Sequence, residues 1–275
     1  MVVCGITGHT GTLGKELLKN KLFLFNKFKG DITKYSDVVE WVDKNNLDLI
    51  IHLAAIVPTQ KVNQDYLVAK KVNYQGTINL INAINKKKKN LNWFFFSSTS
   101  HVYKIQNNKT KITENFLKKP YSKYGNTKWL AEKYIISKLD KRIPFCIGRI
   151  FSFTGKSQPK EFFIPAILKK IKTSTKKTVT LQNLNHYRDF ISLEDIVRAI
   201  TLLYKTKSKG VFNIGSGKKV SLISIANYIC AKYDKTLHHI ESKSKATYLI
   251  ANIDKLAKLK FNISNNIFKI IDKII

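Results

Sequence analysis

Cysteine, arginine and long apolar runs are scarce in this sequence of 275 residues. The three cysteines, Cys4, Cys146 and Cys230, are odd in number and lie in apolar runs, which favours buried thiols in a reducing compartment over disulfides. No apolar run approaches the ~20 residues that a membrane-spanning helix needs, and the first residues lack the basic region of a signal peptide. These absences predict a cytoplasmic protein without disulfides, a membrane span or a bound metal.

Acidic residues are also few, since 18 Asp and Glu against 49 Lys and Arg give a formal charge of +31. Such a charge can indicate a nucleic acid or an anionic membrane as partner. However, only four basic residues are arginines, whose planar guanidinium group suits phosphates and base edges. The one dense lysine run, residues 86–89, is typical of a solvated loop. We therefore expect no specific nucleic-acid partner, no membrane partner, and at most a general attraction for anionic substrates.

Short apolar runs alternate with longer amphipathic stretches, as in βαβ units around a parallel sheet covered on both faces. Strands are predicted at residues 2–7, 22–25, 49–53, 93–97, 145–150 and 211–214. Helices are predicted at residues 12–19, 34–43, 66–84, 121–139 and 193–204, the last with Ser192 as its cap. This order predicts an α/β fold with a Rossmann-like, doubly wound parallel sheet.

The alternation weakens between residues 154 and 188, and further helical segments follow Gly217, including a pattern at residues 263–274. We expect these pieces, residues 154–188 and 216–275, to form a smaller substrate-binding lobe. The main domain is then residues 1–153, to which residues 189–215 return. The two parts are thus interleaved in sequence.

Three glycines, Gly8, Gly11 and Gly14, separate the first predicted strand from the first helix. Glycines in this place allow positive φ angles and let backbone N–H groups approach a pyrophosphate at the positive end of the helix. A tight turn without a ligand is the alternative, but the strand–loop–helix context favours a dinucleotide. Cofactor contacts are expected from Gly8, Thr10, Gly11, Thr12, Leu13 and Gly14, which makes residues 1–153 a NAD(P)-binding domain.

The end of the second predicted strand bears on the choice between NAD and NADP. An acidic residue that would hold an adenosine ribose is missing there, because Phe25 and Asn26 are followed by Lys27 and Lys29. This favours NADP over NAD, although only slightly in so lysine-rich a chain.

Tyr124 and Lys128 lie four residues apart on a helical pattern, so their side chains share one face. A phenol with a pKa of ~10 is a poor base near neutral pH, but a neighbouring ammonium group favours the phenolate. A surface Tyr–Lys pair is the alternative. The catalytic interpretation is strengthened by residues 97–100, where a buried strand ends in hydroxyl groups, because open α/β sheets hold their sites at such ends.

Together these motifs resemble the extended short-chain dehydrogenase/reductase family, in its nucleotide-sugar (NAD-dependent) epimerase and dehydratase branch, including dTDP-4-dehydrorhamnose reductase-like members. Residues 72–77, 148–155, 187–195 and 212–217 extend this similarity over nearly the whole chain. The resemblance implies that Thr99 hydrogen-bonds the substrate oxygen and that Tyr124 exchanges its proton. Lys128 would orient the nicotinamide ribose and lower the pKa of Tyr124. Ser98 and Ser100 are the alternatives to Thr99 if the register differs by one.

The resemblance also implies further contacts to the cofactor and the substrate. Asp31 would meet the adenine edge, and Arg188 would bind the substrate's diphosphate, as a guanidinium group can. From the residues alone, Asp31 is equally a helix-capping loop residue, residues 53–55 are equally a strand end, and Arg188 can pair with Asp189 or Glu194. The other implied cofactor contacts are Ile32, Leu53, Ala54, Ala55, Asn73, Ser97, Ile150 and Phe151, and the other implied substrate contacts are Ser100 and Ser152.

The reaction expected from this resemblance is hydride transfer at the carbonyl of a nucleotide-diphosphate sugar, as a 4-ketoreductase or a 4-epimerase. A dehydratase is disfavoured, because Ser100 and His101 stand where that branch carries Asp and Glu. A dinucleotide-binding regulatory protein without catalysis is the alternative, against which the intact Thr99, Tyr124 and Lys128 argue. The resemblance further implies a homodimer, formed through the helices at residues 66–84 and 121–139.

Overall fold

The computed structural model describes residues 1–57, 59–87, 91–241 and 244–275, which form two compact units. The first unit consists of Met1–Lys104, Leu117–Ile150 and Val197–Phe212. The second unit consists of Ile105–Phe116, Phe151–Ile196 and Asn213–Ile275.

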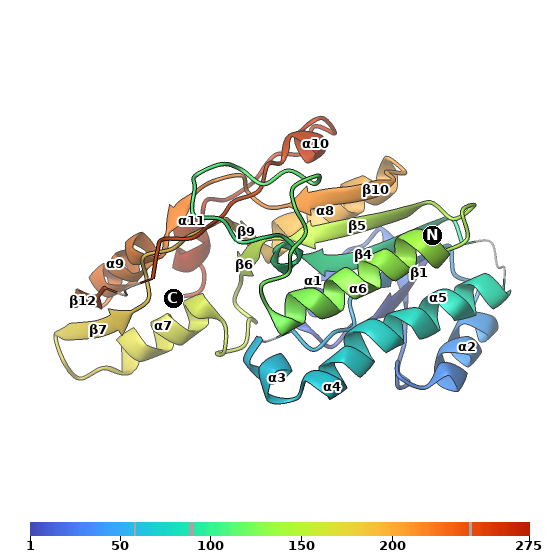
Figure 1. Cartoon of the computed structure of the whole chain (residues 1–275), viewed down its shortest axis with the longest axis horizontal. Coiled ribbons are helices and arrows are strands. Elements are labelled where there is room, and N and C mark those ends of the chain that lie inside the picture. The colour runs from blue at the N-terminus through green and yellow to red at the C-terminus, as the bar shows by residue number, and fades with distance from the viewer. Residues whose placement is uncertain (58, 88–90, 242–243) are drawn as a thin grey trace. The chain divides into compact units, whose positions relative to one another are not determined.

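A six-stranded sheet forms the centre of the first unit, with the strand order β10-β5-β4-β3-β1-β2 (Figure 1). Its strands are β1 (Val2–Thr7), β2 (Phe23–Lys27), β3 (Leu49–His52), β4 (Trp93–Thr99), β5 (Phe145–Ile150) and β10 (Gly210–Ile214). The neighbouring pairs from β2 to β5 run parallel. After β1 the chain adds β2 on one side and β3 to β5 on the other, so β1 and β3 flank the point where ligands bind in such sheets.

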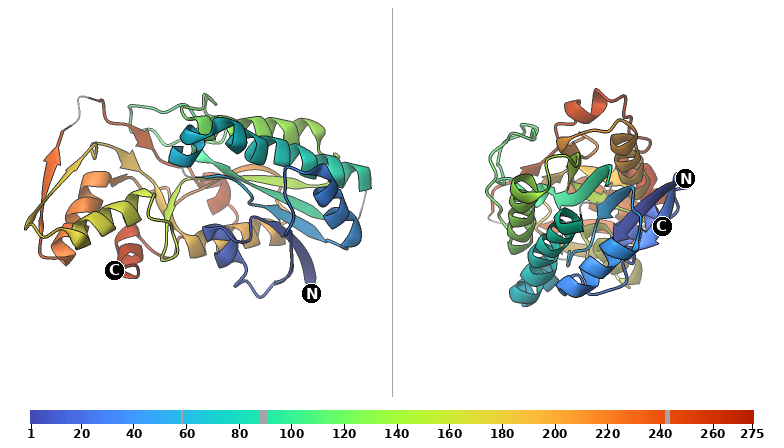
Figure 2. Two further views of the ribbon diagram at one scale, coloured as in Figure 1. Left: turned by 90° about the horizontal axis from the view of Figure 1, so that it is seen from below. Right: turned by 90° about the vertical axis from the view of Figure 1, so that its right-hand side faces the viewer.

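Helices cover both faces of this sheet (Figures 1 and 2). One face packs against α2 (Tyr35–Lys44), α5 (Gly76–Lys87) and α6 (Lys123–Lys138), around side chains that include Ile50, Phe94 and Phe96. The other face carries α1 (Thr12–Leu17) and α8 (Leu193–Lys205), where the Trp93 ring meets Tyr204 at 5.6 Å between centroids. Because both faces are covered, the strands consist largely of apolar residues instead of alternating apolar and polar ones.

The predicted helix at residues 66–84 consists of three elements. These are α4 (Tyr66–Lys70), a π-helical turn, η1 (Lys71–Gln75), and α5. A short helix, α3 (Thr59–Gln64), precedes them, and η2 (Ser100–Val102) is a 3-10 turn directly after β4. The π turn contains the buried Asn73, and such turns often occur at functional sites.

The second unit has its own core, which includes Ile167, Ile171, Ile225 and Ile271. Its helices are α7 (Phe163–Thr173), α9 (Leu222–Lys232), α10 (Asp254–Ala257) and α11 (Ile267–Asp272). Its short strands are β6 (Ser152–Thr154), β7 (Thr178–Gln182), β8 (Tyr187–Arg188), β9 (Phe190–Ser192), β11 (Val220–Ser221), β12 (Thr236–Ile240) and β13 (Tyr248–Leu249). They form a three-stranded sheet, β11-β8-β13, and two parallel pairs, β12-β7 and β6-β9.

The prediction of a doubly wound α/β fold is confirmed. The two units differ from the expected main domain and smaller lobe in where their boundaries fall along the chain. Residues 105–116, expected in the main domain, belong to the second unit because Gln106 and Ile112 form β-bridges with Tyr248 and Ala251. Residues 151–153, 189–196 and 213–215, also expected in the main domain, belong to the second unit as well. Ser192 caps α8 as expected, since its Oγ accepts the N–H of Asp195 at 3.0 Å.

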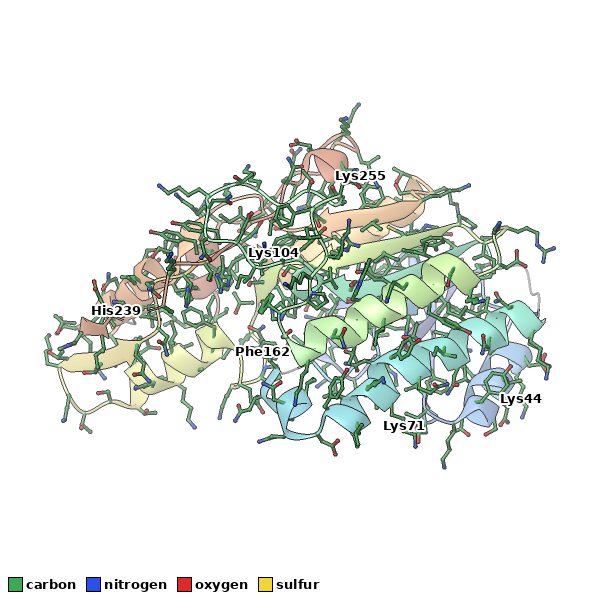
Figure 3. All side chains as sticks on the ribbon, viewed as in Figure 1. Lys44, Lys71, Lys104, Phe162, His239 and Lys255 are labelled. Carbon is green, nitrogen blue, oxygen red and sulfur yellow. The ribbon has the colours of Figure 1, made fainter. Side chains whose placement is uncertain are left out.

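Lysines cover the surface, as Figure 3 shows for Lys44, Lys71, Lys104 and Lys255, which are all exposed. The dense run begins inside α5, not in a loop, with its first two residues, Lys86 and Lys87; Lys88 and Lys89 lie outside the described residues. Within the described part of the chain, no helix is long and apolar enough to cross a membrane.

Candidate active site

The two elements that carry the expected catalytic residues meet at the carboxyl end of β4. Thr99 is the last residue of β4, and Tyr124 and Lys128 lie on the first turns of α6. The Thr99 side chain lies close enough to Tyr124 to act on its pKa, and Lys128 is 1% exposed. The structure therefore brings all three residues together in the first unit.

Close packing of α6 against the turn after β4 makes this arrangement possible. Ser122 caps α6, because its Oγ accepts the N–H of Gly125 at 3.0 Å. A Cβ atom on Gly125 would lie 2.3 Å from the carbonyl oxygen of His101, so only glycine permits this approach. The His101 ring lies edge-on to Tyr124, with 5.7 Å between centroids, and its Nδ1 is 3.2 Å from Ser122 Oγ. His101 thus packs beside Tyr124.

Burial controls the protonation of the Tyr124 and Lys128 side chains. Burial raises the pKa of Tyr124 above its ordinary value, and the hydrogen bond from Thr99 opposes this. The expected lowering by Lys128 is therefore not found in the protein without its ligands. Burial also lowers the pKa of Lys128 to about 7, while the charge of Glu132 acts to raise it. The Lys128 Nζ lies 4.0 Å from the centroid of the Phe96 ring.

The glycine loop between β1 and α1 has the shape of a phosphate cradle. Gly8 has a φ of +72°, and a Cβ atom there would lie 2.5 Å from the backbone nitrogen of Ala54. A Cβ atom on Gly14 would lie 2.3 Å from the carbonyl oxygen of Gly8. Gly11, which precedes the first residue of α1, is exposed, and a Cβ atom on it would meet only the carbonyl oxygen of Gly8, at 3.4 Å. The loop therefore fits a dinucleotide pyrophosphate beside the N–H groups of α1.

Within this loop the remaining expected contacts differ in exposure. Thr10 is exposed, Thr12 is half-buried and Leu13 is buried. Thr10 and the backbone of the loop are therefore the parts accessible to a ligand.

A chain of buried polar groups connects β1 with α6. His52 Nδ1 lies 2.6 Å from Thr7 Oγ1, and its Nε2 lies 3.0 Å from Thr77 Oγ1. Thr77 donates to the carbonyl of Asn73 at 2.8 Å. Asn73 in turn donates to Thr127 Oγ1, on α6, at 3.1 Å. Asn73 therefore has a structural role, which includes hydrogen bonds to both backbone groups of Ile56.

The residues expected near the adenosine lie at the end of β2 and in the segment between β2 and α2. Asp31 is exposed, and its Oδ1 accepts the N–H and the hydroxyl of Thr33, which lowers its pKa. Ile32 is buried against α5, where its carbonyl accepts from Asn79. At the end of β2, Asn26 accepts from the Trp41 indole at 2.7 Å, and Lys27 is exposed. Asp31 thus stabilises the turn before α2, the role that the residues alone left open.

Strand ends supply the other expected contacts of the first unit. Leu53, Ala54 and Ala55 follow β3 and are half-buried, and Leu53 N donates to Thr7 O at 3.2 Å. Ser97 is half-buried on β4, whereas Ser98 and Ser100 are each 2% exposed. Ile150, the last residue of β5, pairs with Thr99 in the sheet.

The remaining expected residues, Phe151, Ser152 and Arg188, belong to the second unit. Phe151 is 3% exposed and Ser152 begins β6. Arg188 is half-buried, and its Nη1 donates to the carbonyls of Tyr187 and Thr247 at 2.8 and 3.1 Å.

The carboxylate of Asp189 accepts the backbone N–H groups of Ser216, Gly217 and Ala251. Arg188 is therefore held by backbone carbonyls of β8 and of the segment before β13, while its neighbour Asp189 serves as a structural acceptor.

A buried ion pair at the site was missed from sequence. Glu132 on α6 and Arg149 on β5 form hydrogen bonds at 2.6 to 3.2 Å, and Ser98 donates to the same carboxylate. A signal existed, because Arg149 is one of only four arginines and Glu132 stands four residues after Lys128. Among the described residues, no group of three or more His, Cys, Asp and Glu side chains is placed to hold a metal ion.

The chain is similar to one protein family and to several known proteins over most of its length. A family model described as GDP-mannose 4,6 dehydratase matches residues 3–268. A GDP-6-deoxy-D-talose 4-dehydrogenase from Aggregatibacter actinomycetemcomitans is 29% identical over 258 residues, which are 89% of this chain and 83% of that protein.

The chain is also similar to an epimerase in sequence and to a solved structure in fold. A UDP-glucose 4-epimerase from Lactobacillus helveticus is also 29% identical, over 72% of this chain and 65% of the epimerase, so the chain spans just under two thirds of its length. The structure of RMD from Pseudomonas aeruginosa complexed with NADPH superimposes with a TM-score of 0.88 at 18% identity, over 100% of this chain and 97% of that one. This likeness shows a common fold.

Proposed function

We propose that this chain, which belongs to the short-chain dehydrogenase/reductase family of nucleotide-sugar epimerases and dehydratases, transfers hydride at C4 of a nucleotide-diphosphate sugar with NAD(P). The observation that carries the proposal is that Thr99 at the end of β4 and Tyr124 and Lys128 on the first turns of α6 are buried together. A regulatory protein of the same fold has no need for this buried combination.

Each residue of the trio has a distinct task in the proposed reaction. Bound NAD(P) would supply or accept the hydride. Thr99 Oγ1 holds the sugar oxygen, and Tyr124 Oη donates a proton to that oxygen during reduction and removes it during oxidation. Lys128, when protonated, favours the tyrosinate and binds the ribose of the cofactor.

The cofactor and the sugar nucleotide are proposed by the same reasoning. The glycine loop is the site for the pyrophosphate, and Lys27 in place of an acidic residue favours NADP over NAD. Arg188 is the proposed ligand of the substrate's diphosphate. The relative named as a GDP-6-deoxy-D-talose 4-dehydrogenase supports redox chemistry at C4.

Reduction or epimerisation at C4 is favoured over dehydration. Elimination of water from the sugar needs an additional acid and base, and Ser100 and His101 stand where the dehydratases of this branch carry Asp and Glu. Cys4, Cys146 and Cys230 are buried as thiols, which supports a location in the reducing cytoplasm.

A turnover screen with a single substitution tests the proposed function. Purified protein is offered NADPH and NADH with a panel of nucleotide sugars and their 4-keto derivatives. A reductase consumes the reduced cofactor stoichiometrically, whereas an epimerase converts the sugar without net consumption of the cofactor.

Tyr124→Phe removes only the proton-transferring hydroxyl and should reduce kcat by ~100-fold or more, with cofactor binding unchanged. The control is Tyr134→Phe, which removes the hydroxyl of a half-buried tyrosine on α6 that bonds Asn82 on α5. Full activity of Tyr124→Phe would contradict the mechanism.

A further inference from the structure

An ion pair that the proposed reaction does not use lies buried behind the catalytic helix. Glu132 is fully buried, and the Arg149 side chain is 2% exposed. Arg149 Nη2 donates to Glu132 Oε2 at 2.6 Å, and its Nε donates to Oε1 at 3.1 Å. The two side chains thus form a forked pair, the geometry in which a guanidinium binds a carboxylate best.

This pair connects the elements that carry the catalytic trio. Ser98, next to Thr99 on β4, donates its hydroxyl to Glu132. Arg149 on β5 donates through Nη1 to the Tyr103 hydroxyl at 3.0 Å. Glu132 itself is on α6, one helical turn after Lys128. The carboxylate is therefore fixed from β4 and β5, and its position relative to Lys128 is fixed by the helix.

Stability alone is a weak reason for such a pair. Taking both charges out of water costs several kcal/mol per ion, and apolar residues of similar volume often stabilise a protein equally well. The place of the pair suggests another role, because residues four apart on a helix lie on one face. The fixed carboxylate therefore lies on the same face of α6 as Lys128, which is almost completely buried.

The other groups around Lys128 give its charge little support. His52 on β3 is neutral at physiological pH, since burial, and secondarily the charge of Lys128, lowers its pKa to about 3. Tyr124 is also neutral, because burial raises its pKa, and Phe96 offers only the face of its ring. Arg149 is a cation whose charge is matched by Glu132. The negative charge that acts to raise the pKa of Lys128 is that of Glu132.

We propose that Glu132 is a positioning residue whose carboxylate, fixed by Arg149 and Ser98, keeps Lys128 in its charged form beside Tyr124. The importance of this charge rests on the proposed function, in which protonated Lys128 assists Tyr124. The effect itself is a property of the chain without cofactor or substrate.

The test is a ¹³C NMR titration of Lys128 in the protein without cofactor, labelled with ¹³Cε-lysine and assigned with the Lys128→Arg variant. In the wild type the Lys128 pKa is about 7. In Glu132→Gln the pKa of Lys128 should fall by ~1 pH unit or more, because the attraction of the carboxylate is lost while burial persists. The double variant Glu132→Met/Arg149→Met replaces the pair with apolar side chains of similar length and should fold. Its Lys128 pKa should lie between that of the wild type and that of Glu132→Gln, because loss of the Arg149 charge offsets part of the loss of the carboxylate.

The direction of the change separates this role from a merely structural one. If the pair only stabilised the packing, its loss would admit water and move the Lys128 pKa up, toward 10.5. A rise or no change in both variants would therefore overturn the proposal. Glu40→Gln is the matched control, because it removes one carboxylate from an exposed ion pair with Lys44 on α2 and should leave Lys128 unchanged.

Turnover gives a second, separate measurement. If the Lys128 pKa falls from about 7 to about 6, the charged fraction at pH 7 falls about fivefold, so kcat should fall similarly and recover at lower pH. A wild type that never turns over any nucleotide sugar would contradict the proposed function, while the NMR result would still decide the role of Glu132.

Discussion

At the scale of single residues, burial changes the chemistry of side chains whose types are ordinary. His52, Tyr124 and Lys128 all lie in the interior, and the pKa of each departs from its usual value toward the neutral form. Hydrogen bonds to neutral partners hold His52 between Thr7 and Thr77. The polar groups at this edge of the sheet therefore remain uncharged at neutral pH, except where a partner such as Glu132 supports a charge.

His52 predicts a loss of stability in acid. Its folded pKa is about 3, whereas the unfolded chain has the ordinary value of 6.5, so below pH 6.5 the unfolded state binds a proton that the folded state does not. The free energy of unfolding should therefore fall as the pH decreases from 6.5 toward 3, by at most about 1.4 kcal/mol per pH unit from this group. Urea denaturation of wild type and His52→Gln at several pH values measures this.

The pH dependence of stability in His52→Gln is the comparison for the wild type. His52→Gln keeps an amide that can bond the two threonines but cannot titrate, so its stability should depend less steeply on pH between about 6 and about 4. Equal slopes for the two proteins would show that His52 is not the group responsible.

At the scale of elements, the loop from β1 to α1 and the turn after β4 share one device, which is glycine at a point of close approach. Gly14 packs against the carbonyl of Gly8, and Gly125 packs against the carbonyl of His101. In both places a helix begins beside the end of a strand. Gly11 is different, because the space on its open side is free of protein atoms closer than 3.4 Å.

This difference predicts that alanine at one position of the glycine loop affects cofactor binding, and that alanine at the other affects stability. Gly11→Ala should leave thermal stability unchanged but weaken NADPH binding ~10-fold or more, because the new methyl group occupies the place proposed for the pyrophosphate. Gly14→Ala should lower the melting temperature, because its methyl group meets the backbone at 2.3 Å. Fluorescence titration with NADPH and differential scanning calorimetry measure the two effects. Unchanged NADPH affinity in Gly11→Ala would argue against a phosphate site in this loop.

At the scale of the whole molecule, the resemblance implies a homodimer through the helices after β3 and before β5. On the outer surface of these helices the first unit exposes apolar side chains, namely Leu67, at 77%, Val68, at 49%, and Ile136, at 51%. Contact between two copies of the chain would remove such apolar side chains from water, which favours association. We therefore expect α4 and α6 to form the contact between two copies of the chain.

A single charge placed on this surface should prevent dimer formation. Leu67→Glu introduces a carboxylate that would lose its hydration in an apolar interface, so sedimentation velocity should show a monomer at concentrations where the wild type is a dimer. Ile240→Glu is the control, because Ile240 is similarly apolar and 47% exposed but belongs to the second unit. A dimeric Leu67→Glu would place the interface elsewhere.

Local sequence determined much of this protein. Two strands, β1 and β5, have the predicted bounds, and the glycine loop lies where the three glycines indicate, because apolar periodicity and turn chemistry are properties of neighbouring residues. The spacing of Tyr124 and Lys128 likewise follows from one helix. A helix with a π turn was not predictable in detail, since the turn around Asn73 depends on hydrogen bonds to Ile56 and Thr127.

The tertiary structure alone decided which charges are buried and how they are balanced. Glu132 meets Arg149 and Ser98 across 17 and 34 residues of sequence, and no local pattern encodes these distances. Burial likewise raised the pKa of Tyr124, against the lowering expected from its neighbour Lys128, because desolvation depends on everything that packs around a group. The sequence alone predicted Thr99, Tyr124 and Lys128 as a group, and the path of the chain decided their protonation, because solvent exclusion is a collective property of the folded core.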